Sequence, residues 1–149
     1  MFKLLVCFSL AISGMAVGTA RADTSVNENK RLVMQFYDLA FLKHQPAEAA
    51  KRYLGTKYTQ HNPRVPDGPE VFAQFFEGFF KQNPTASSAV KRVIAEDDLV
   101  AIHSHSKIGA EDRGRAIIDI FRVEGGKIVE HWDVIQAVPE TSANQNSMF

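Results

Sequence analysis

The stretch DIFRVEGGKIVEHWDVIQ, residues 119–136, decides the fold of this chain. It belongs to two runs rich in β-branched and aromatic residues, 115–123 and 127–138, which are joined by the tripeptide EGG at 124–126. Two adjacent glycines between such runs are typical of a tight β-hairpin, because glycine readily adopts the positive φ angles of short hairpin turns. We therefore expect two antiparallel strands here.

The extended pattern continues upstream of this hairpin. Residues 89–95 and 99–108 read as two further strands joined by a turn at 96–98, and the loop GAEDRG leads into the hairpin. A short strand-like segment, 57–60, stands apart from them. Because most of these strands are joined by short turns, the sheet should be mostly antiparallel.

Helical periodicity dominates the first half of the chain. Apolar residues recur at helical spacing over residues 26–42, behind the capping-box pattern Ser25-x-x-Glu28, and Pro46 opens a shorter helix, PAEAAKRYL. The segment EVFAQFFEGFFKQN, residues 70–83, carries a wide stripe that includes five phenylalanines. Core packing is the simplest interpretation of this stripe, and the lining of an apolar cavity is the alternative.

Helices that come first and an antiparallel meander that follows predict an α+β fold. We expect about three N-terminal helices packed on a curved, mostly antiparallel sheet, which together form a cone-shaped α+β barrel. A single domain would span residues 23–149, with a polar tail from about residue 139. The mouth of such a cone is a natural site for a small molecule.

The first 22 residues are expected to be removed. MFKLLVCFSLAISGMAVGTARA has a basic residue at Lys3, an apolar run to about residue 17, and the small-x-small signal Ala20-Arg21-Ala22. This is typical of a secretory signal peptide cut after Ala22. An uncleaved anchor is the less favoured alternative, because the apolar run is shorter than the roughly 20 residues of a membrane span. We expect a periplasmic or secreted protein with no membrane contact after cleavage.

Composition excludes several classes of protein. The 149 residues are 45% hydrophobic and 23% charged with zero net charge, which is ordinary for a globular domain and offers no nucleic-acid surface. The only cysteine, Cys7, would leave with the signal peptide, so the mature chain would have neither a disulfide nor a thiol nucleophile. Nucleotide and serine-hydrolase chemistry have no support, because the sequence has no glycine-rich phosphate loop and no GxSxG.

The last predicted strand mixes polar and apolar residues on both faces. Strict alternation divides it into two sets. One set is Val129, His131, Asp133 and Ile135, and the other is Ile128, Glu130, Trp132 and Val134. Alternation alone does not show which set faces a cavity.

Asp119, on the preceding strand, shares a face with Phe121 and has apolar sequence neighbours. A carboxylate so placed must pair with a cation, accept hydrogen bonds or have its pKa raised. A functional role and an ion pair at the rim of the sheet both fit this pattern. The candidate partners of such an ion pair are Arg113, Arg115 and Arg122.

Other polar residues are weaker candidates. His61 and Asn62 stand just before Pro63, where Asn62 could bond its own backbone in a turn or either residue could lie at the cavity mouth. His103 and His105 share a strand face, and two such histidines can bind a metal with a third ligand. Their spacing is not a specific zinc pattern, and solvated strand positions explain it more simply, so no metal is predicted.

The segments YTQHNPRVPDGPEVFAQFF and DIFRVEGGKIVEHWDVIQ together resemble the SnoaL-like branch of the nuclear transport factor 2-like superfamily, over about residues 26–138. The resemblance implies a cone-shaped α+β barrel with a deep pocket, often dimerising through its sheet. Characterised members include polyketide cyclases, which close a ring by intramolecular aldol condensation without a cofactor. It therefore implies a small apolar ligand with a carbonyl group, no cofactor, and a homodimer that covers outer-face side chains such as Trp132.

The resemblance places the catalytic base on Asp133, which would take a proton from carbon beside a carbonyl, with His131 and Asp119 as further catalytic residues. Such chemistry also needs a hydrogen-bond donor for the developing enolate oxygen, which His131, Asn62 or a protonated Asp119 could supply. The expected substrate-binding residues are His61, Asn62, Phe36, Tyr37, Phe76 and Phe121.

Ketosteroid isomerases of the same superfamily also work through an enolate. Asp119 falls where these enzymes keep an oxyanion-binding aspartate, but their tyrosine donor falls on Phe36, beside Tyr37, and their base falls on Asn62. Steroid isomerisation is therefore not expected. Two hypotheses remain: a cofactor-independent enzyme of the aldol-condensation, cyclase or isomerase type, and a non-catalytic domain that binds a ligand in the same pocket.

Overall fold

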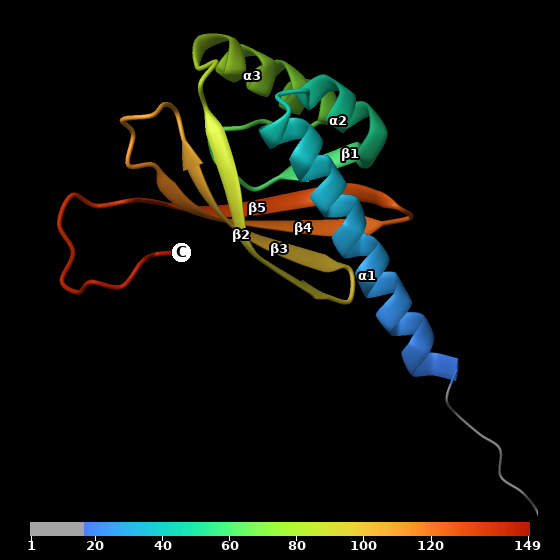
Figure 1. Ribbon diagram of the computed structural model, residues 1–149. Coiled ribbons are helices and arrows are strands. Elements are labelled where there is room, and N and C mark those ends of the chain that lie inside the picture. The colour runs from blue at the N-terminus through green and yellow to red at the C-terminus, as the bar shows by residue number, and fades with distance from the viewer. Residues whose placement is uncertain (1–16) are drawn as a thin grey trace, which may run out of the picture.

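The structure, a computed structural model, describes residues 17–149 (Figure 1). The three α-helices are α1 (Val17–Tyr37), which continues into a π-helical turn, η1 (Asp38–Leu42), α2 (Pro46–Tyr53) and α3 (Pro69–Gln82), and the first strand lies between α2 and α3. Five strands form one sheet: β1 (Leu54–Gln60), β2 (Ser87–Glu96), β3 (Leu99–Lys107), β4 (Arg115–Glu124) and β5 (Lys127–Ala137).

The strand order is β1-β5-β4-β3-β2, with β1 parallel to β5 and the other three pairings antiparallel. Figure 1 shows the strongly curved sheet with α1 crossing it and with α2 and α3 beyond β1. The predicted α+β fold, with three helices on a curved and mostly antiparallel sheet, is confirmed. The sheet is not closed, because β1 and β2 remain its two edges, so the cone is an open one.

The predicted signal peptide, residues 1–22, lies largely outside the described residues, and its cleavage stays a prediction. α1 begins at Val17, earlier than the expected start near residue 26, and runs through the predicted cleavage point after Ala22. A chain cut there would keep residues 23–37 of this helix. None of the helices within residues 17–149 combines the length and the apolar character needed to cross a membrane.

The core lies between α1 and the concave face of the sheet. Phe36 is fully buried, and its ring centroid lies 5.4 Å from that of Phe72 on α3 and 5.6 Å from that of Phe121 on β4. These contacts join the helical layer to the sheet, and their burial is worth about 25 cal/mol for each Å² of apolar surface. Aliphatic residues of the sheet complete this core: Val100, Ile102, Val123 and Ile128.

A β-bulge in β5 decides which of its side chains face the helices. Arg122 pairs with Glu130 but Val123 pairs with Ile128, so Val129 is an extra residue that interrupts alternation. Ile128 is therefore fully buried on the concave side, the side to which His131 also belongs. The two-face division expected from strict alternation was wrong for Ile128.

The outer face of the sheet carries exposed apolar side chains, among them Ile94 at 67% and Val134 at 69% exposure. The homodimer through this face stays a prediction. The tail from residue 138 has no helix or strand, as expected, but it returns to the sheet instead of fraying (Figure 1). The ring of Phe149 lies 4.2 Å from that of His105 and 5.7 Å from that of His103.

Gly114→Ala is expected to destabilise the fold by about 2–4 kcal/mol, because two penalties combine there. Gly114 has a φ of +85°, and an added Cβ would lie 2.5 Å from both His105 Nε2 and the backbone oxygen of Ser106. Gly125→Ala is the matched control, since Gly125 also has positive φ (+57°) but open space around it. It should cost only about 1 kcal/mol. Equal losses in urea denaturation would show that the contact at Gly114 relaxes.

Candidate functional site

A pocket of about 320 Å³ lies between α3, the end of α1 and the concave face of the sheet. Its helical wall is aromatic, formed by Phe41 and by all five phenylalanines of α3. Only Phe72 of these five is buried, and Phe75 is 43% exposed. The stripe on α3 therefore serves mainly as a cavity wall, which was the alternative to core packing.

One cluster of polar groups in the pocket comes from three strands, and Arg64, Arg115 and three serines, Ser87, Ser88 and Ser106, also line the pocket. Asp119 lies on β4, His131 and Asp133 lie on β5, and Gln60 ends β1 with Asn62 just beyond. Asp119 and Asp133 are direct cross-strand partners. Like charges that face each other across a sheet are unfavourable, so the two carboxyl groups cannot both be ionised without a penalty.

Asp119 and His131 form a buried pair. His131 Nε2 lies 3.1 Å from Asp119 Oδ1, and the two residues are 7% and 8% exposed. No arginine pairs with Asp119 among the described residues, so that alternative was wrong. The three candidate arginines contact other groups: Arg113 donates to the backbone oxygen of Val138, Arg115 pairs with Asp112, and Arg122 pairs with Glu124 and Glu130.

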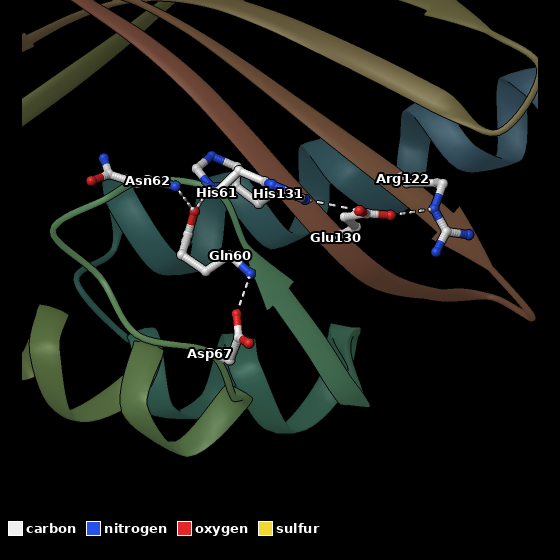
Figure 2. A network of polar contacts seen from close by, with 7 residues as sticks. All are labelled: Gln60, His61, Asn62, Asp67, Arg122, Glu130 and His131. Carbon is white, nitrogen blue, oxygen red and sulfur yellow. Dashed lines mark hydrogen bonds and ion pairs between the residues drawn. The ribbon is translucent and has the colours of Figure 1, made fainter.

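The side-chain oxygen of Gln60 determines which nitrogen of His131 carries a proton. Gln60 Oε1 lies 2.9 Å from the backbone N–H of Asn62 and 2.8 Å from His131 Nδ1 (Figure 2). Because a backbone N–H can only donate, the Gln60 atom at this point must be the oxygen. His131 Nδ1 therefore donates to it, and Nε2 shares a proton with Asp119. When this proton lies on Asp119, the pair consists of a neutral imidazole and a carboxylic acid. When it lies on His131 Nε2, the pair consists of an imidazolium and a carboxylate.

Burial raises the pKa of Asp119 above its ordinary value, and the charge of Asp133 raises it further. The hydrogen bond from His131 and its charge oppose this shift without cancelling it. The neutral form of the pair is thus favoured over a wider pH range than an exposed aspartate would allow. Asp119 can hold a proton and donate it.

Asp133 is held by Asn62. Asn62 Nδ2 donates to Asp133 Oδ2 at 2.6 Å, and Asn62 Oδ1 accepts from the backbone N–H of Arg64 at 2.9 Å. The second bond orients the amide, so both interpretations of Asn62 hold at once: it forms a local turn, and it faces the pocket. Asp133 Oδ1 has no protein partner among the described residues and is free to meet a ligand.

His61 lies on the other side of β5 and does not line the pocket. Its ring stacks on Trp132 with centroids 4.7 Å apart, and its Nε2 lies 2.9 Å from Glu130 Oε1 (Figure 2). Its backbone N–H donates to the carbonyl oxygen of His131 at 2.9 Å. These contacts of His61 hold the end of β1 beside β5. Trp132 is half-buried, and the His61 ring covers one of its faces.

The structure divides the other predicted substrate-binding residues into two groups. Tyr37, Asn62, Phe76 and Phe121 line the pocket, whereas Phe36 lies in the core behind it. The Tyr37 hydroxyl is already engaged, since it donates to Ser104 Oγ and contacts Ser88 Oγ, each at 2.9 Å. Burial raises the pKa of Tyr37, so this hydroxyl stays neutral.

Sequence reasoning missed two pocket residues on β1, Tyr58 and Gln60. A signal was present, because Tyr58, Gln60 and Asn62 are spaced by two residues and so share one strand face. The strand-like pattern over residues 57–60 is too short to show which of its faces is buried.

The only metal-ligand grouping among residues 17–149 is Asp119, His131 and Asp133, not the pair His103 and His105. One ligand atom from each of the three lies within 4.8 Å of the others. A carboxylate–imidazole set of this kind suits a divalent ion. His103 and His105 instead contact Arg92 and the backbone oxygen of Arg113.

Fold and site together define a small-molecule pocket protein with the nuclear transport factor 2-like fold. The model of the SnoaL-like polyketide cyclase family matches residues 31–142, and the chain belongs to this family. No curated protein matches the chain.

Solved structures agree on the fold. A provisionally named polyketide cyclase from Bacillus cereus has a TM-score of 0.65 at 19% identity, covering 78% of this chain and 80% of its own. A provisionally named SnoaL-like polyketide cyclase from Jannaschia sp. CCS1 gives 0.60 at 17%, covering 73% and 85%. A provisionally named ketosteroid isomerase from Kribbella flavida gives 0.63 at 14%, covering 80% and 86%.

Asp119→Asn is expected to gain stability relative to the wild type as pH rises. Because the pKa of Asp119 is higher in the folded than in the unfolded protein, protonation of Asp119 contributes to the free energy of unfolding. This contribution is fully present below the unfolded pKa of about 3.9. It is lost as pH rises through the folded pKa. Urea unfolding at several pH values from 4 to 8 should show a difference, variant minus wild type, that increases with pH.

Asp112→Asn provides a control of opposite sign. Hydrogen bonds from the backbone N–H groups of Ile108 and Gly114 lower the pKa of Asp112, so its contribution is present above the unfolded pKa and lost as pH falls. The deficit of this variant should therefore shrink toward acid pH. A flat profile for Asp119→Asn would contradict the raised pKa of Asp119.

Proposed function

We propose that this protein is a cofactor-independent enzyme that removes a proton from carbon beside a carbonyl group, in an aldol condensation, cyclisation or isomerisation. The observation that carries the proposal is the pairing of two unlike carboxyl groups in one apolar pocket. Asp133 is held by an amide and has a free oxygen, while Asp119 is buried and shares a proton with His131. Such a split is what acid–base chemistry near neutral pH requires.

The groups can act in one sequence. The Asp133 carboxylate takes the proton of the α-carbon, and the C–H electron pair becomes the C=C bond of an enolate. The proton shared by Asp119 and His131 turns to the oxygen that receives the carbonyl π electrons, since the other N–H of His131 already donates to Gln60. In an isomerisation, Asp133 returns the proton to another carbon. In an aldol reaction, the enolate carbon forms a bond to a second carbonyl carbon, and the oxygen of that carbonyl takes the proton back from Asp133.

The pocket supports a small, largely apolar substrate. Its volume lies at the lower end of the range typical of small-molecule sites, roughly 300–1,000 Å³. The phenylalanines of α3 offer flat faces and edges to aromatic or conjugated ligands. The polar groups lie on the opposite, sheet side, so a carbonyl at one edge of the ligand would meet them.

Asp133→Asn should lower the rate of α-proton exchange by about 10²- to 10⁴-fold. The measurement is proton NMR of benzoylacetone and acetophenone in D₂O with the full domain, in EDTA and separately with added Zn²⁺. The two conditions are needed because the metal-ligand grouping includes the same three residues. Asp98→Asn, at an exposed turn remote from the pocket, is the matched control and should exchange at the wild-type rate.

The second hypothesis, a non-catalytic binding domain, is the other outcome of this experiment. Ketones that bind the wild type but exchange no faster than in buffer would establish it. Exchange that appears only with Zn²⁺ would replace the metal-free mechanism by a metal-assisted one.

We also propose that the protein is exported. The basic residue, the apolar run and the Ala20-Arg21-Ala22 signal support this. Expression of the full chain in a bacterium should give a periplasmic or secreted product whose N-terminal sequence begins at Asp23. An intact Met1 on a cytoplasmic product would contradict export.

A further inference from the structure

The hydroxyl of Tyr58 is a buried polar group that lacks a partner. Tyr58 is 2% exposed, its ring packs against Phe72, and it lines the pocket. It is the one buried side-chain polar atom among the described residues that makes no hydrogen bond. An unsatisfied buried hydroxyl destabilises the fold and is expected to persist only where something else requires it.

Gln60 cannot accept the Tyr58 proton. Gln60 is close enough to lower the pKa of Tyr58, although burial outweighs this and raises that pKa overall. The Gln60 oxygen, however, already accepts two hydrogen bonds, from Asn62 N–H and His131 Nδ1. A carbonyl oxygen has two lone pairs, so Gln60 can offer Tyr58 only its amide N–H. The Tyr58 O–H proton is left without an acceptor.

The surroundings of this hydroxyl keep it in its donor form. Burial raises the pKa of Tyr58, and the charges of Asp119 and Asp133 raise it further, so this hydroxyl stays protonated. Tyr37 provides a contrast in the same pocket, since its hydroxyl is taken up by Ser104 and Ser88. Of the two tyrosines that line the cavity, only Tyr58 has a proton to offer a ligand.

We propose that Tyr58 is a catalytic residue that donates a hydrogen bond to the carbonyl oxygen of the ligand and to the enolate oxygen formed from it. This inference deepens the proposed function and rests on it. Tyr58 would hold the oxygen together with the proton that Asp119 shares with His131, while Asp133 takes the proton of the α-carbon. The role falls on β1, at a position that the resemblance to ketosteroid isomerases does not indicate.

The test uses two probes of the same shape, 2-naphthol and naphthalene, at pH 7. A naphthol oxygen resembles the enolate oxygen, and naphthalene lacks it. The wild type should bind 2-naphthol at least tenfold more tightly. Tyr58→Phe should weaken 2-naphthol binding by about tenfold, the value of one hydrogen bond, and change naphthalene binding by less than twofold.

Two further measurements separate this role from a structural one. Tyr53→Phe is the matched control, because Tyr53 lies at the end of α2 and does not line the pocket; both affinities should stay at wild-type values. The Tm of ligand-free Tyr58→Phe should equal or exceed that of the wild type, since an unsatisfied hydroxyl is removed. A lower Tm would show that the hydroxyl has a structural partner and would overturn the inference.

The outcomes also distinguish this inference from the proposed function. If the wild type prefers 2-naphthol and Tyr58→Phe retains that preference, Tyr58 is not the donor, and the oxyanion site of the proposed function stands. If the wild type binds both probes equally, the pocket has no oxyanion site, and both proposals fail.

Discussion

Two hydrogen bonds to the side-chain oxygen of Gln60 organise the polar half of the pocket. One comes from His131 and determines its tautomer; the other comes from the backbone of Asn62 and begins the turn that carries the Asn62 amide to Asp133. The Gln60 backbone N–H in turn donates to Asp67 Oδ1 at 2.7 Å, which ties the following loop to the end of β1 (Figure 2). The side-chain amide of Gln60 therefore positions both the proposed base, Asp133, and the Asp119–His131 pair.

The position of this amide depends on the unusual placement of β1. Within the sheet formed by residues 17–149, β1 and β5 make the one parallel pair, and β1 is an edge strand. The stack of His61 on Trp132 and the ion pairs through Glu130 to Arg122 brace that edge from the outside. The contacts of His61 and Glu130 on the outer face and the hydrogen bonds of Gln60 in the pocket therefore stabilise the same pair of strands, β1 and β5, from opposite faces.

Two features of the pocket reduce the stability of the fold. Asp119 on β4 lies directly opposite Asp133 on the neighbouring strand β5, inside an apolar cavity, and the Tyr58 hydroxyl has no hydrogen-bond partner. Replacing such groups by apolar ones of similar size is often neutral or stabilising. A function in ligand binding or catalysis explains these groups in one cavity better than a role in folding does, because strained and unsatisfied groups persist where function requires them.

Much of the fold was determined by the sequence alone. The EGG turn, the strand periods and the phenylalanine stripe follow from local stereochemistry and from the alternation of apolar residues, and they predicted the α+β class and the order of elements. His131, Asp133 and Asp119 were also identifiable, because polar side chains in otherwise apolar strands must be satisfied.

Only the tertiary structure decided how these residues meet. The bulge at Val129 moves Ile128 into the core, and a bulge depends on pairing between strands rather than on the residues of one strand. The parallel pairing of β1 with β5 brings Gln60 and Tyr58 to His131, some seventy residues away in the chain, and sends His61 to the opposite face. Burial, which raises the pKa of Asp119 and leaves Tyr58 unsatisfied, is a property of the packed cavity that no stretch of the sequence contains by itself.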